Sequence, residues 1–199
     1  EAVQDFLQIM EGEVDRLSAL VESLLELTNL EAAERAAQVS MDALIRDAEG
    51  EAALSAAARD VSIQTDISPC VLPGNERLLH RAVFNLLENA VKYSPAGGTV
   101  RVSGHLEDGR FRLDVSDQGP GIPPDLRRRI FEPFFRVDDA RTRQQGGAGL
   151  GLALVQAIAE AHGGTVRMEE RAAGGSRFIL ELPCALEPAV CTAPDRPKL

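Results

Sequence analysis

Apolar residues in the first part of the chain are spaced as they are along one face of a helix. Leucine, valine, phenylalanine and methionine recur from Val3 to Leu27 at heptad-like positions, and a second apolar row widens this stripe on one side. A stripe of that width is typical of helical bundles rather than of two-stranded seams. The pattern predicts an amphipathic helix over residues 1–34 that packs on a partner helix or on its own globular domain.

Beyond this helix, the hydrophobic period switches repeatedly between that of a strand and that of a helix, which is typical of an α/β domain. Turns are predicted at Pro69, Pro73 and Gly74, Asn75 can cap the helix that follows, and residues 107–109 can form a hairpin turn. The predicted helices cover 42–59, 75–93 and 150–161, and the predicted strands cover 61–67, 99–106, 110–115, 165–170 and 176–182.

Two segments follow neither period. Residues 120–147 are rich in proline, arginine and glycine, and they predict a long cover loop with a short helical piece. A loop of that length inside a compact domain is usually functional or disordered. Residues 184–199 combine prolines with little apolar content, so we expect a disordered tail there.

The composition narrows the classes of partner. The chain has 199 residues, of which 44% are hydrophobic, and this is enough for one well-buried core. Asp and Glu number 31 against 21 Lys and Arg, and the net charge of −10 disfavours binding to nucleic acid. Three cysteines without a CxxC motif indicate neither a disulfide framework nor a zinc site, and they fit a reducing cytosol.

The hydrophobic pattern also bears on membranes. No apolar run approaches the ~18 residues that a membrane-spanning helix needs, so we expect no membrane contact by this chain. The chain begins with Glu1 rather than Met, and a membrane segment could lie in a longer parent protein. We therefore expect the cytoplasmic portion of a protein that could be a membrane-bound sensor.

The segment NLLENAVKYS, residues 85–94, separates two kinds of side chain on one predicted helix. Asn85, Asn89 and Lys92 share one stripe at ~100° per residue, and the apolar side chains form another. An amide oxygen is a hard ligand suited to Mg²⁺, and a lysine is a point charge suited to phosphate. Tyr93 lies between the stripes, where its ring could flank a base. An ordinary surface helix is the alternative interpretation.

Two glycine-containing segments predict close approaches of the backbone to a ligand. DQGPGI begins at Asp117, whose carboxylate could accept a hydrogen bond from the amino group of adenine, while Gly119 and Gly121 would admit a flat ring. GAGLGL, residues 147–152, opens a predicted helix, where backbone N–H groups and the helix dipole favour phosphate oxygens. A tight turn and a flexible hinge are the respective alternatives.

Phenylalanine and arginine are concentrated on the predicted cover loop. Phe131, Phe134 and Phe135 supply three of the seven phenylalanines, and a mobile loop keeps such residues only if they dock part of the time. Arginines that follow them could reach a γ-phosphate and stabilise developing charge, or could simply be solvated. These arginines are Arg136, Arg141 and Arg143.

In order and spacing, the segments NLLENAVKYS, DQGPGI, FEPFFR and GGAGLGLAL resemble the N box, first glycine box, F box and second glycine box of sensor histidine kinases. The wider family also contains gyrase, MutL and the ninety-kilodalton heat-shock chaperone. The resemblance covers roughly residues 38–183 and implies a Bergerat-type two-layer α/β sandwich, with a mixed sheet under helices and ATP beneath a flexible lid at about 120–147. Residues 1–34 resemble the second helix of the family's dimerisation and phosphotransfer hairpin, whose first helix would be absent.

The resemblance also implies roles for individual residues. Asn89 would hold Mg²⁺, with Asn85 beside it. Lys92 would meet phosphate, Tyr93 would flank the base, and Asp117 would read the adenine amino group. The nucleotide pocket would be completed by Gly119, Gly121, Ile122, Phe131, Gly147, Gly149, Leu150, Gly151 and Leu152. Catalytic contributions would come from Asn85, Lys92, Arg136, Arg141 and Arg143.

Two departures from the family pattern affect the expected activity. Ala148 stands where kinases often carry Ser or Thr, so a hydroxyl contact to phosphate is absent. His80, His105 and His162 lack the sequence context of the family's acceptor histidine, which should therefore lie upstream of residue 1. We expect this chain to bind Mg-ATP without phosphorylating itself and to dimerise weakly or not at all, although the full-length protein would be a homodimer.

The expected function is that of a histidine kinase catalytic core, which passes the γ-phosphate to a histidine for relay to an aspartate of a cognate response regulator. A hydrolytic ATPase of the same superfamily is disfavoured, because Asn85 stands where those enzymes place a general-base Glu and cannot accept a proton from water. Glu88 lies about 60° further around the helix and is a poor substitute. A non-catalytic nucleotide-binding or dimerising module is the third possibility.

Overall fold

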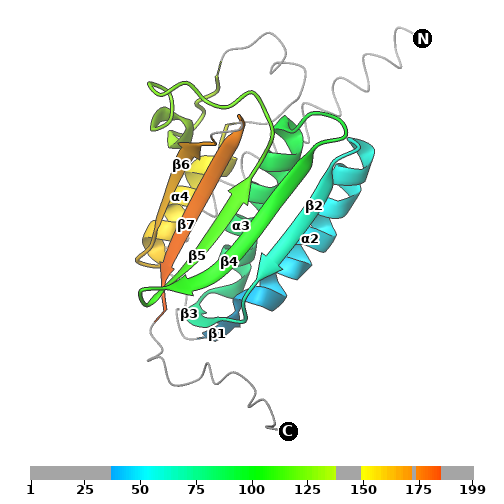
Figure 1. Ribbon diagram of the computed structural model, residues 1–199. Helices are drawn as coiled ribbons and strands as arrows, with labels where there is room; N and C mark the ends of the chain where they lie inside the picture. Colours follow the sequence, from blue (N-terminus) through cyan, green and yellow to red (C-terminus); the bar gives the residue numbers. More distant parts are fainter. Residues whose placement is uncertain (1–36, 138–148, 172–173, 185–199) are drawn as a thin grey trace, which may run out of the picture.

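The computed structural model describes residues 37–137, 149–171 and 174–184. Within these ranges, three helices cover one face of a five-stranded sheet and leave the other face open (Figure 1). This arrangement is the expected two-layer α/β sandwich. The amphipathic helix predicted over residues 1–34 lies outside the described residues. The predicted tail, residues 184–199, also lies outside them apart from its first residue, Cys184.

The sheet is mixed, as expected. Its strand order is β2-β4-β5-β7-β6, with β2 and β4 parallel and every other neighbouring pair antiparallel. The parallel pairing needs a crossover connection, and helix α3 (Glu76–Tyr93) is part of it. The strands are β2 (Ser62–Ile67), β4 (Thr99–Glu107), β5 (Arg110–Ser116), β6 (Thr165–Glu170) and β7 (Ser176–Pro183).

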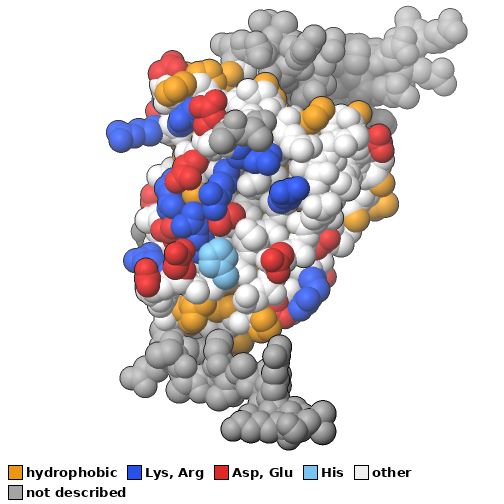
Figure 2. Space-filling model, in the orientation of Figure 1, with side chains coloured by type: hydrophobic (Ala, Val, Ile, Leu, Met, Phe, Trp, Pro, Cys, Tyr) orange, Lys and Arg blue, Asp and Glu red, His pale blue; other side chains and the backbone are white. Residues whose placement is uncertain are grey.

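Alternation along the central strands divides the sheet into a core face and an open face. Eight core-facing side chains of β4, β5 and β7 are at most 2% exposed, and these are Val100, Val102, Phe111, Leu113, Val115, Phe178, Leu180 and Leu182. On the open face, charged side chains of both signs are intermixed, mainly over β5, β6 and β7 (Figure 2). The core therefore lies between the sheet and the helices.

The helical layer is centred on α3, which packs against both α2 (Met41–Ala58) and α4 (Gly151–Ala161). The side-chain oxygen of Asn75 accepts a hydrogen bond from Leu78 N at 3.1 Å, which confirms the predicted helix cap. The predicted apolar stripe is confirmed as well, because each of its members is fully buried. These members are Leu79, Val83, Leu86, Leu87 and Ala90.

One pair of strands differs from the sequence-based expectation. β1 (Ala37–Ser40) and β3 (Val71–Gly74) form a separate two-stranded antiparallel sheet, so Pro73 and Gly74 belong to a strand rather than to turns. Strands of four residues are too short to show a clear alternation. Proline is tolerated because β3 pairs on one side only, with β1, and its other edge needs no donor.

The β4–β5 hairpin confirms the turn predicted from its sequence. Asp108 and Gly109 both have positive φ, 50° and 75°, as a two-residue type I′ turn requires. The other predicted helices and strands agree with the structure to within one residue at each end. Within the described ranges, no helix is long and apolar enough to cross a membrane.

Candidate functional site

The four sequence segments meet where α3 ends and α4 begins. The position that a Cβ would take at Gly151 lies 3.4 Å from Asn85 Oδ1, which brings the start of α4 to the amide stripe of α3. The corresponding position at Gly119 lies 2.7 Å from the carbonyl oxygen of Tyr93. The helix segment NLLENAVKYS therefore touches both glycine-containing segments, as the site prediction requires.

The loop segment FEPFFR joins the same cluster through Gly149. A Cβ at this glycine would lie 2.9 Å from the Phe135 carbonyl oxygen, and its φ of +73° is one that side chains rarely adopt. The backbone N–H of Phe134 donates to the Gly149 carbonyl oxygen at 3.0 Å. The described part of the predicted lid is thus docked on the start of α4 by close backbone contacts.

Asn85 presents an unsatisfied amide to this cluster. Its Nδ2 atom is buried and has no hydrogen-bond partner among the described residues. Buried side-chain amides are normally paired, so an orphaned donor of this kind indicates a place for a ligand. Asn89 lies one helical turn further on, is half-buried, and so falls on the same stripe as predicted.

Lys92 lies in an electropositive environment at the end of α3. Burial, followed by the nearby charges of Arg136 and Arg59, lowers the pKa of Lys92, and Glu88 opposes this effect. Arg59 also donates from Nη1 to the Lys92 carbonyl oxygen at 3.2 Å. Cations that crowd one another are stabilised by a polyanion. The structure therefore brings Arg136 near Lys92, together with Arg59, which the sequence did not indicate.

Tyr93 follows directly after this cation cluster of Arg59, Lys92 and Arg136. Its ring is half-buried, and the ammonium nitrogen of Lys92 lies 5.5 Å from the ring centroid. Burial raises the pKa of Tyr93, with a smaller opposing effect from Arg136. Tyr93 consequently stays neutral near pH 7 and offers an uncharged ring beside the cations, as flanking a base would require.

Asp117 is a buried carboxylate at the other side of the cluster. Its side chain is 1% exposed, and Oδ1 accepts hydrogen bonds from Gly119 N at 2.8 Å and Ser176 N at 3.0 Å. Burial raises the pKa of Asp117, while these backbone donors and the charge of Arg171 act in the opposite direction. A carboxylate held in this way is a fixed acceptor, suited to an amino group such as that of adenine.

The turn between β6 and β7 supports Asp117 and was missed by the sequence reasoning. A Cβ at Gly175 would lie 2.2 Å from the Asp117 carbonyl oxygen, so only glycine fits there. Asp117 N donates to the Ser176 carbonyl oxygen at 2.9 Å, and Arg171 Nη1 donates to the Asp117 carbonyl oxygen at 2.5 Å. The glycine pair before Ser176 was the available signal, but nothing local connected it with Asp117.

The described part of the predicted lid contains a short 3-10 helix, η2 (Arg129–Phe131), as the sequence indicated. The Phe131 ring packs edge-on against Phe178, with centroids 6.4 Å apart, so it belongs partly to the core. The Arg129 guanidinium lies 4.3 Å from the centroid of the Phe135 ring. Phe134 is 58% exposed and has a φ of 65°. Two of the three phenylalanines are therefore docked.

The remaining predicted pocket residues line the same region or lie outside the described ranges. Leu150 is 2% exposed and forms the N-cap of α4, while Ile122 and Leu152 are half-buried against the core. A Cβ at Gly121, where φ is +75°, would lie 3.7 Å from the Gly175 carbonyl oxygen. Arg141, Arg143 and Gly147, together with Ala148, lie outside the described residues.

The three histidines lie away from the cation cluster. His162 Nε2 accepts a hydrogen bond from Asn75 N at 3.1 Å, at the start of α3. Asn75 lies about 17 residues before Lys92, which is ~25 Å along a helix that rises ~1.5 Å per residue. His80 lies on the same helix, 3.3 Å from Asp47, and His105 is on the open face of the sheet. None of the three is placed beside the predicted phosphate-binding residues.

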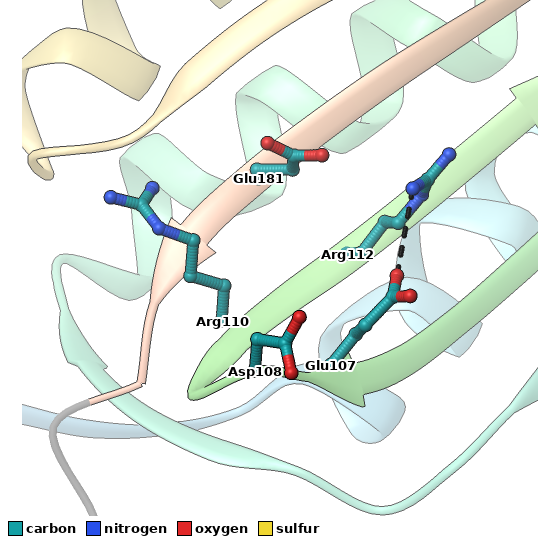
Figure 3. A pocket seen from close by; sticks show the side chains of 5 residues that line it. All are labelled: Glu107, Asp108, Arg110, Arg112 and Glu181. Carbon is teal, nitrogen blue, oxygen red and sulfur yellow. Dashed lines mark hydrogen bonds and ion pairs between the residues drawn. The ribbon is translucent and has the colours of Figure 1, made fainter.

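A hollow on the open face of the sheet is unrelated to this cluster. It lies at the β4–β5 hairpin and is lined by five charged side chains, with an ion pair between Arg112 and Glu107 (Figure 3). Acidic and basic groups offset one another there, so the hollow favours no charged ligand. In Figure 1 the hairpin lies at the lower end of the sheet, whereas the described lid residues lie at the upper end.

Comparison with protein families gives one match over most of the folded region. Residues 74–186 match the family described as histidine kinase-, DNA gyrase B-, and HSP90-like ATPase. The sensor-like histidine kinase SenX3 of Mycobacterium tuberculosis (strain ATCC 25618 / H37Rv) is 38% identical over 191 residues, covering 94% of this chain and 47% of the relative. The chain thus spans about half the length of the curated relatives it matches.

Solved structures with the same fold include histidine kinases. The mycobacterial sensor histidine kinase MprB aligns with a TM-score of 0.68 and 34% identity, over 75% of this chain and 97% of that chain. Full-length ShkA, in complex with AMPPNP, aligns with a TM-score of 0.76 and 30% identity, over 92% of this chain and 39% of that chain. The fold of this chain is therefore shared with a solved histidine kinase.

Proposed function

The chain belongs to the histidine kinase-, DNA gyrase B-, and HSP90-like ATPase family and contains a histidine kinase ATP-binding domain; from this premise we propose that it is the catalytic core of a sensor histidine kinase. In this role it binds Mg-ATP and transfers the γ-phosphate to a histidine side chain. A parent protein with this activity would use cytoplasmic ATP, so the chain would be its cytoplasmic portion.

A single observation carries the proposal: one site combines a group that suits the adenine of ATP with groups that suit its phosphates. A buried carboxylate, Asp117, is fixed by two backbone donors and can accept the adenine amino group. Positive charge for a polyphosphate comes from Lys92, Arg59 and Arg136. The glycine-containing start of α4 lies against Asn85 and adds backbone N–H groups for phosphate oxygens.

The residues present are suited to a Mg²⁺ ion bound together with the phosphates. Within the described ranges, no group of three His, Cys, Asp or Glu side chains could hold a metal, so the cation would depend on amide and phosphate oxygens. Asn89 would supply the amide oxygen, with Asn85 beside it. When bound, Mg²⁺ neutralises phosphate charge and orients the terminal phosphate.

The transfer step needs positioning and charge stabilisation rather than covalent chemistry by this chain. A histidine ring nitrogen attacks the γ-phosphorus, a new N–P bond forms, and the bond to the bridging β–γ oxygen breaks, which releases ADP. The ring proton passes to solvent. Lys92 and Arg136 would stabilise the charge that develops on the transferred group and on ADP, with Arg141 and Arg143 as further candidates on the lid.

We place the acceptor histidine on a separate phosphotransfer helix, in the same or a partner chain. Asn75, which His162 contacts, lies ~25 Å from Lys92 along α3, and none of the three histidines lies at the cation cluster, which supports this assignment. From the phosphohistidine, the phosphate would pass to an aspartate of a response regulator. Homodimerisation of the parent protein would bring the acceptor helix to this site.

Calorimetric titration with Mg-ATP tests the binding assignments. Asp117→Asn replaces the acceptor of the adenine amino group with an amide, and we expect it to reduce ATP affinity at least 100-fold. Asn89→Ala should remove the dependence of ATP binding on Mg²⁺, while leaving metal-independent binding. Titrations of both variants that match the unsubstituted protein would overturn the site.

Labelled ATP distinguishes transfer from hydrolysis. The chain is incubated with [γ-³²P]ATP and Mg²⁺, alone and with a phosphotransfer helix from a related kinase supplied as a separate polypeptide. We expect label on a histidine of that polypeptide and little free phosphate from the chain alone. Rapid release of free phosphate without labelled protein would show instead a hydrolytic ATPase, in spite of Asn85.

A further inference from the structure

The loop of residues 117–122 is held at both of its ends by arginine side chains. At its start, Arg171 Nη1 donates to the carbonyl oxygen of Asp117 at 2.5 Å. At its end, Arg127 Nε donates to the carbonyl oxygen of Ile122 at 3.1 Å. A main-chain carbonyl that accepts a charged donor is held more firmly than one that accepts a neutral donor. The first and last residues of the loop are therefore anchored.

The two arginines are connected through the end of strand β6. Arg127 Nη2 lies 2.5 Å from Glu170 Oε2, and Glu170 directly precedes Arg171 in the chain. Arg127 comes from the segment between the loop and η2, so it belongs to the base of the predicted lid. The side chain of Arg127 is 26% exposed and that of Glu170 is 60% exposed, so the pair is partly open to water. The end of β6 and the residue after it, Arg171, thus contact both the loop of residues 117–122 and the base of the predicted lid.

The short turn after Arg171 keeps this arrangement close to Asp117. Gly174 N donates to the Arg171 carbonyl oxygen at 3.0 Å, and Arg171 N donates to the Gly175 carbonyl oxygen at 3.3 Å. The turn then presents Gly175 and Ser176 directly to Asp117. Each end of the turn therefore contacts the residue that would read the base.

We propose that Arg171, Arg127 and Glu170 form a clasp that positions the loop of residues 117–122 for adenine and joins this loop to the base of the lid. The clasp rests on the proposed function, since it needs a nucleotide whose base lies on this loop. These three are positioning residues, because each acts through the loop and not on the reacting phosphate. Loss of the clasp lets the Asp117 carboxylate move, and base recognition weakens while phosphate binding is retained.

Arg167 provides a matched control on strand β6, which ends just before Arg171. It is also ion-paired, with its Nη1 atom 2.7 Å from Glu181 Oε1, but both residues lie on the open face and neither contacts the loop. Removing its charge should therefore affect stability alone. Comparison of Arg171 with Arg167 distinguishes a residue that positions the loop from one whose charge only stabilises the sheet.

The test compares three ligands in calorimetric titrations: ATP, GTP and inorganic tripolyphosphate. For Arg171→Met and Arg127→Met, we expect ATP affinity to fall about tenfold, the ratio of ATP to GTP affinity to narrow, and tripolyphosphate affinity to stay within about twofold. Arg171→Lys keeps a charged donor, so it should retain more of the ATP affinity than Arg171→Met. If Arg171→Met does not fold, Arg171→Lys takes its place in the titrations. Arg167→Met should leave all three affinities within about twofold.

The possible results separate this inference from the proposed function. If the unsubstituted protein does not bind ATP, both the proposed function and the clasp are wrong. If it binds ATP and Arg171→Met binds ATP with the same affinity and selectivity, only the clasp is wrong. An equal loss of ATP and tripolyphosphate affinity would also overturn the clasp, because it would show a general collapse of the site. A selective loss of adenine binding supports the clasp.

Discussion

At the scale of single residues, Asp117 combines burial with an ionisable group. Taking a carboxylate out of water is costly, and hydrogen bonds from Gly119 N and Ser176 N offset only part of that cost, since the pKa of Asp117 is still raised. A residue kept for stability alone would be easier to satisfy as a neutral side chain. The buried carboxylate therefore fits a residue whose role is to bind a ligand.

This cost gives a prediction with a definite sign. Because the pKa of Asp117 is raised on folding, its protonated form stabilises the fold, and that contribution is lost as the pH rises through the folded-state pKa. We therefore expect Asp117→Asn without nucleotide to have a higher free energy of unfolding than the unsubstituted protein at pH 7. The gain should shrink as the pH falls toward ~3.9, the ordinary Asp pKa.

Urea denaturation at pH 7 and at pH 4 measures this difference, with the unsubstituted protein followed in parallel to remove the effects of other carboxylates. The same variant should lose ATP affinity, so stability and binding should change in opposite directions. An Asn variant that is less stable at pH 7 would mean that the Asp117 carboxylate contributes to the fold itself.

At the scale of elements, α3 and α4 have to be held in register, because α3 carries the amide stripe and the start of α4 carries the glycines. His162 ties the far ends of these helices together. Its Nε2 accepts from Asn75 N at 3.1 Å, and its Nδ1 lies 2.8 Å from the Ile158 carbonyl oxygen. The ring also packs beside Gly74, where a Cβ would lie 3.1 Å from it.

His162→Ala should lower the free energy of unfolding by about 1–2 kcal/mol, because it leaves the half-buried N–H of Asn75 without its acceptor. His105→Ala is the matched control. His105 is about half exposed on the open face, 3.9 Å from Glu107, so its replacement should change stability by no more than about 0.5 kcal/mol. Equal values from chemical denaturation of the two variants would contradict the role given to His162.

At the scale of the whole molecule, one continuous core joins the sheet to the three helices. Leu113→Ala, at a side chain of 0% exposure on β5, should lower the free energy of unfolding by about 2–5 kcal/mol. Leu54→Ala, at a side chain of 83% exposure on α2, should change it by no more than about 0.5 kcal/mol. Urea unfolding followed by circular dichroism compares the two variants.

Because both layers share that core, each variant should still unfold in one transition with an unchanged dependence on urea concentration. A Leu113→Ala protein that loses its sheet signal before its helix signal would show that the layers are stable independently. A large effect of Leu54→Ala would indicate that the exposed side of α2 is covered in solution.

Much of the fold was predictable because its causes are local. Asn75 caps a helix through a contact with Leu78 three residues away, and Asp108 and Gly109 define a hairpin through their own backbone angles. The stripe of Asn85, Asn89 and Lys92 follows from helical periodicity alone. The pairing of β1 with β3 was not predictable, because two four-residue strands carry too little pattern to identify each other.

The sequence by itself determined where most of the helices and strands lie and which four segments are candidates for the site, since periodicity, caps and turn residues act within a few positions. Only the tertiary structure decided which distant residues support those segments. Arg59 reaches Lys92 across 33 positions, Arg171 reaches Asp117 across 54, and His162 reaches Asn75 across 87. Such contacts depend on strand register and helix packing, which are properties of the assembled core and leave no local pattern to read.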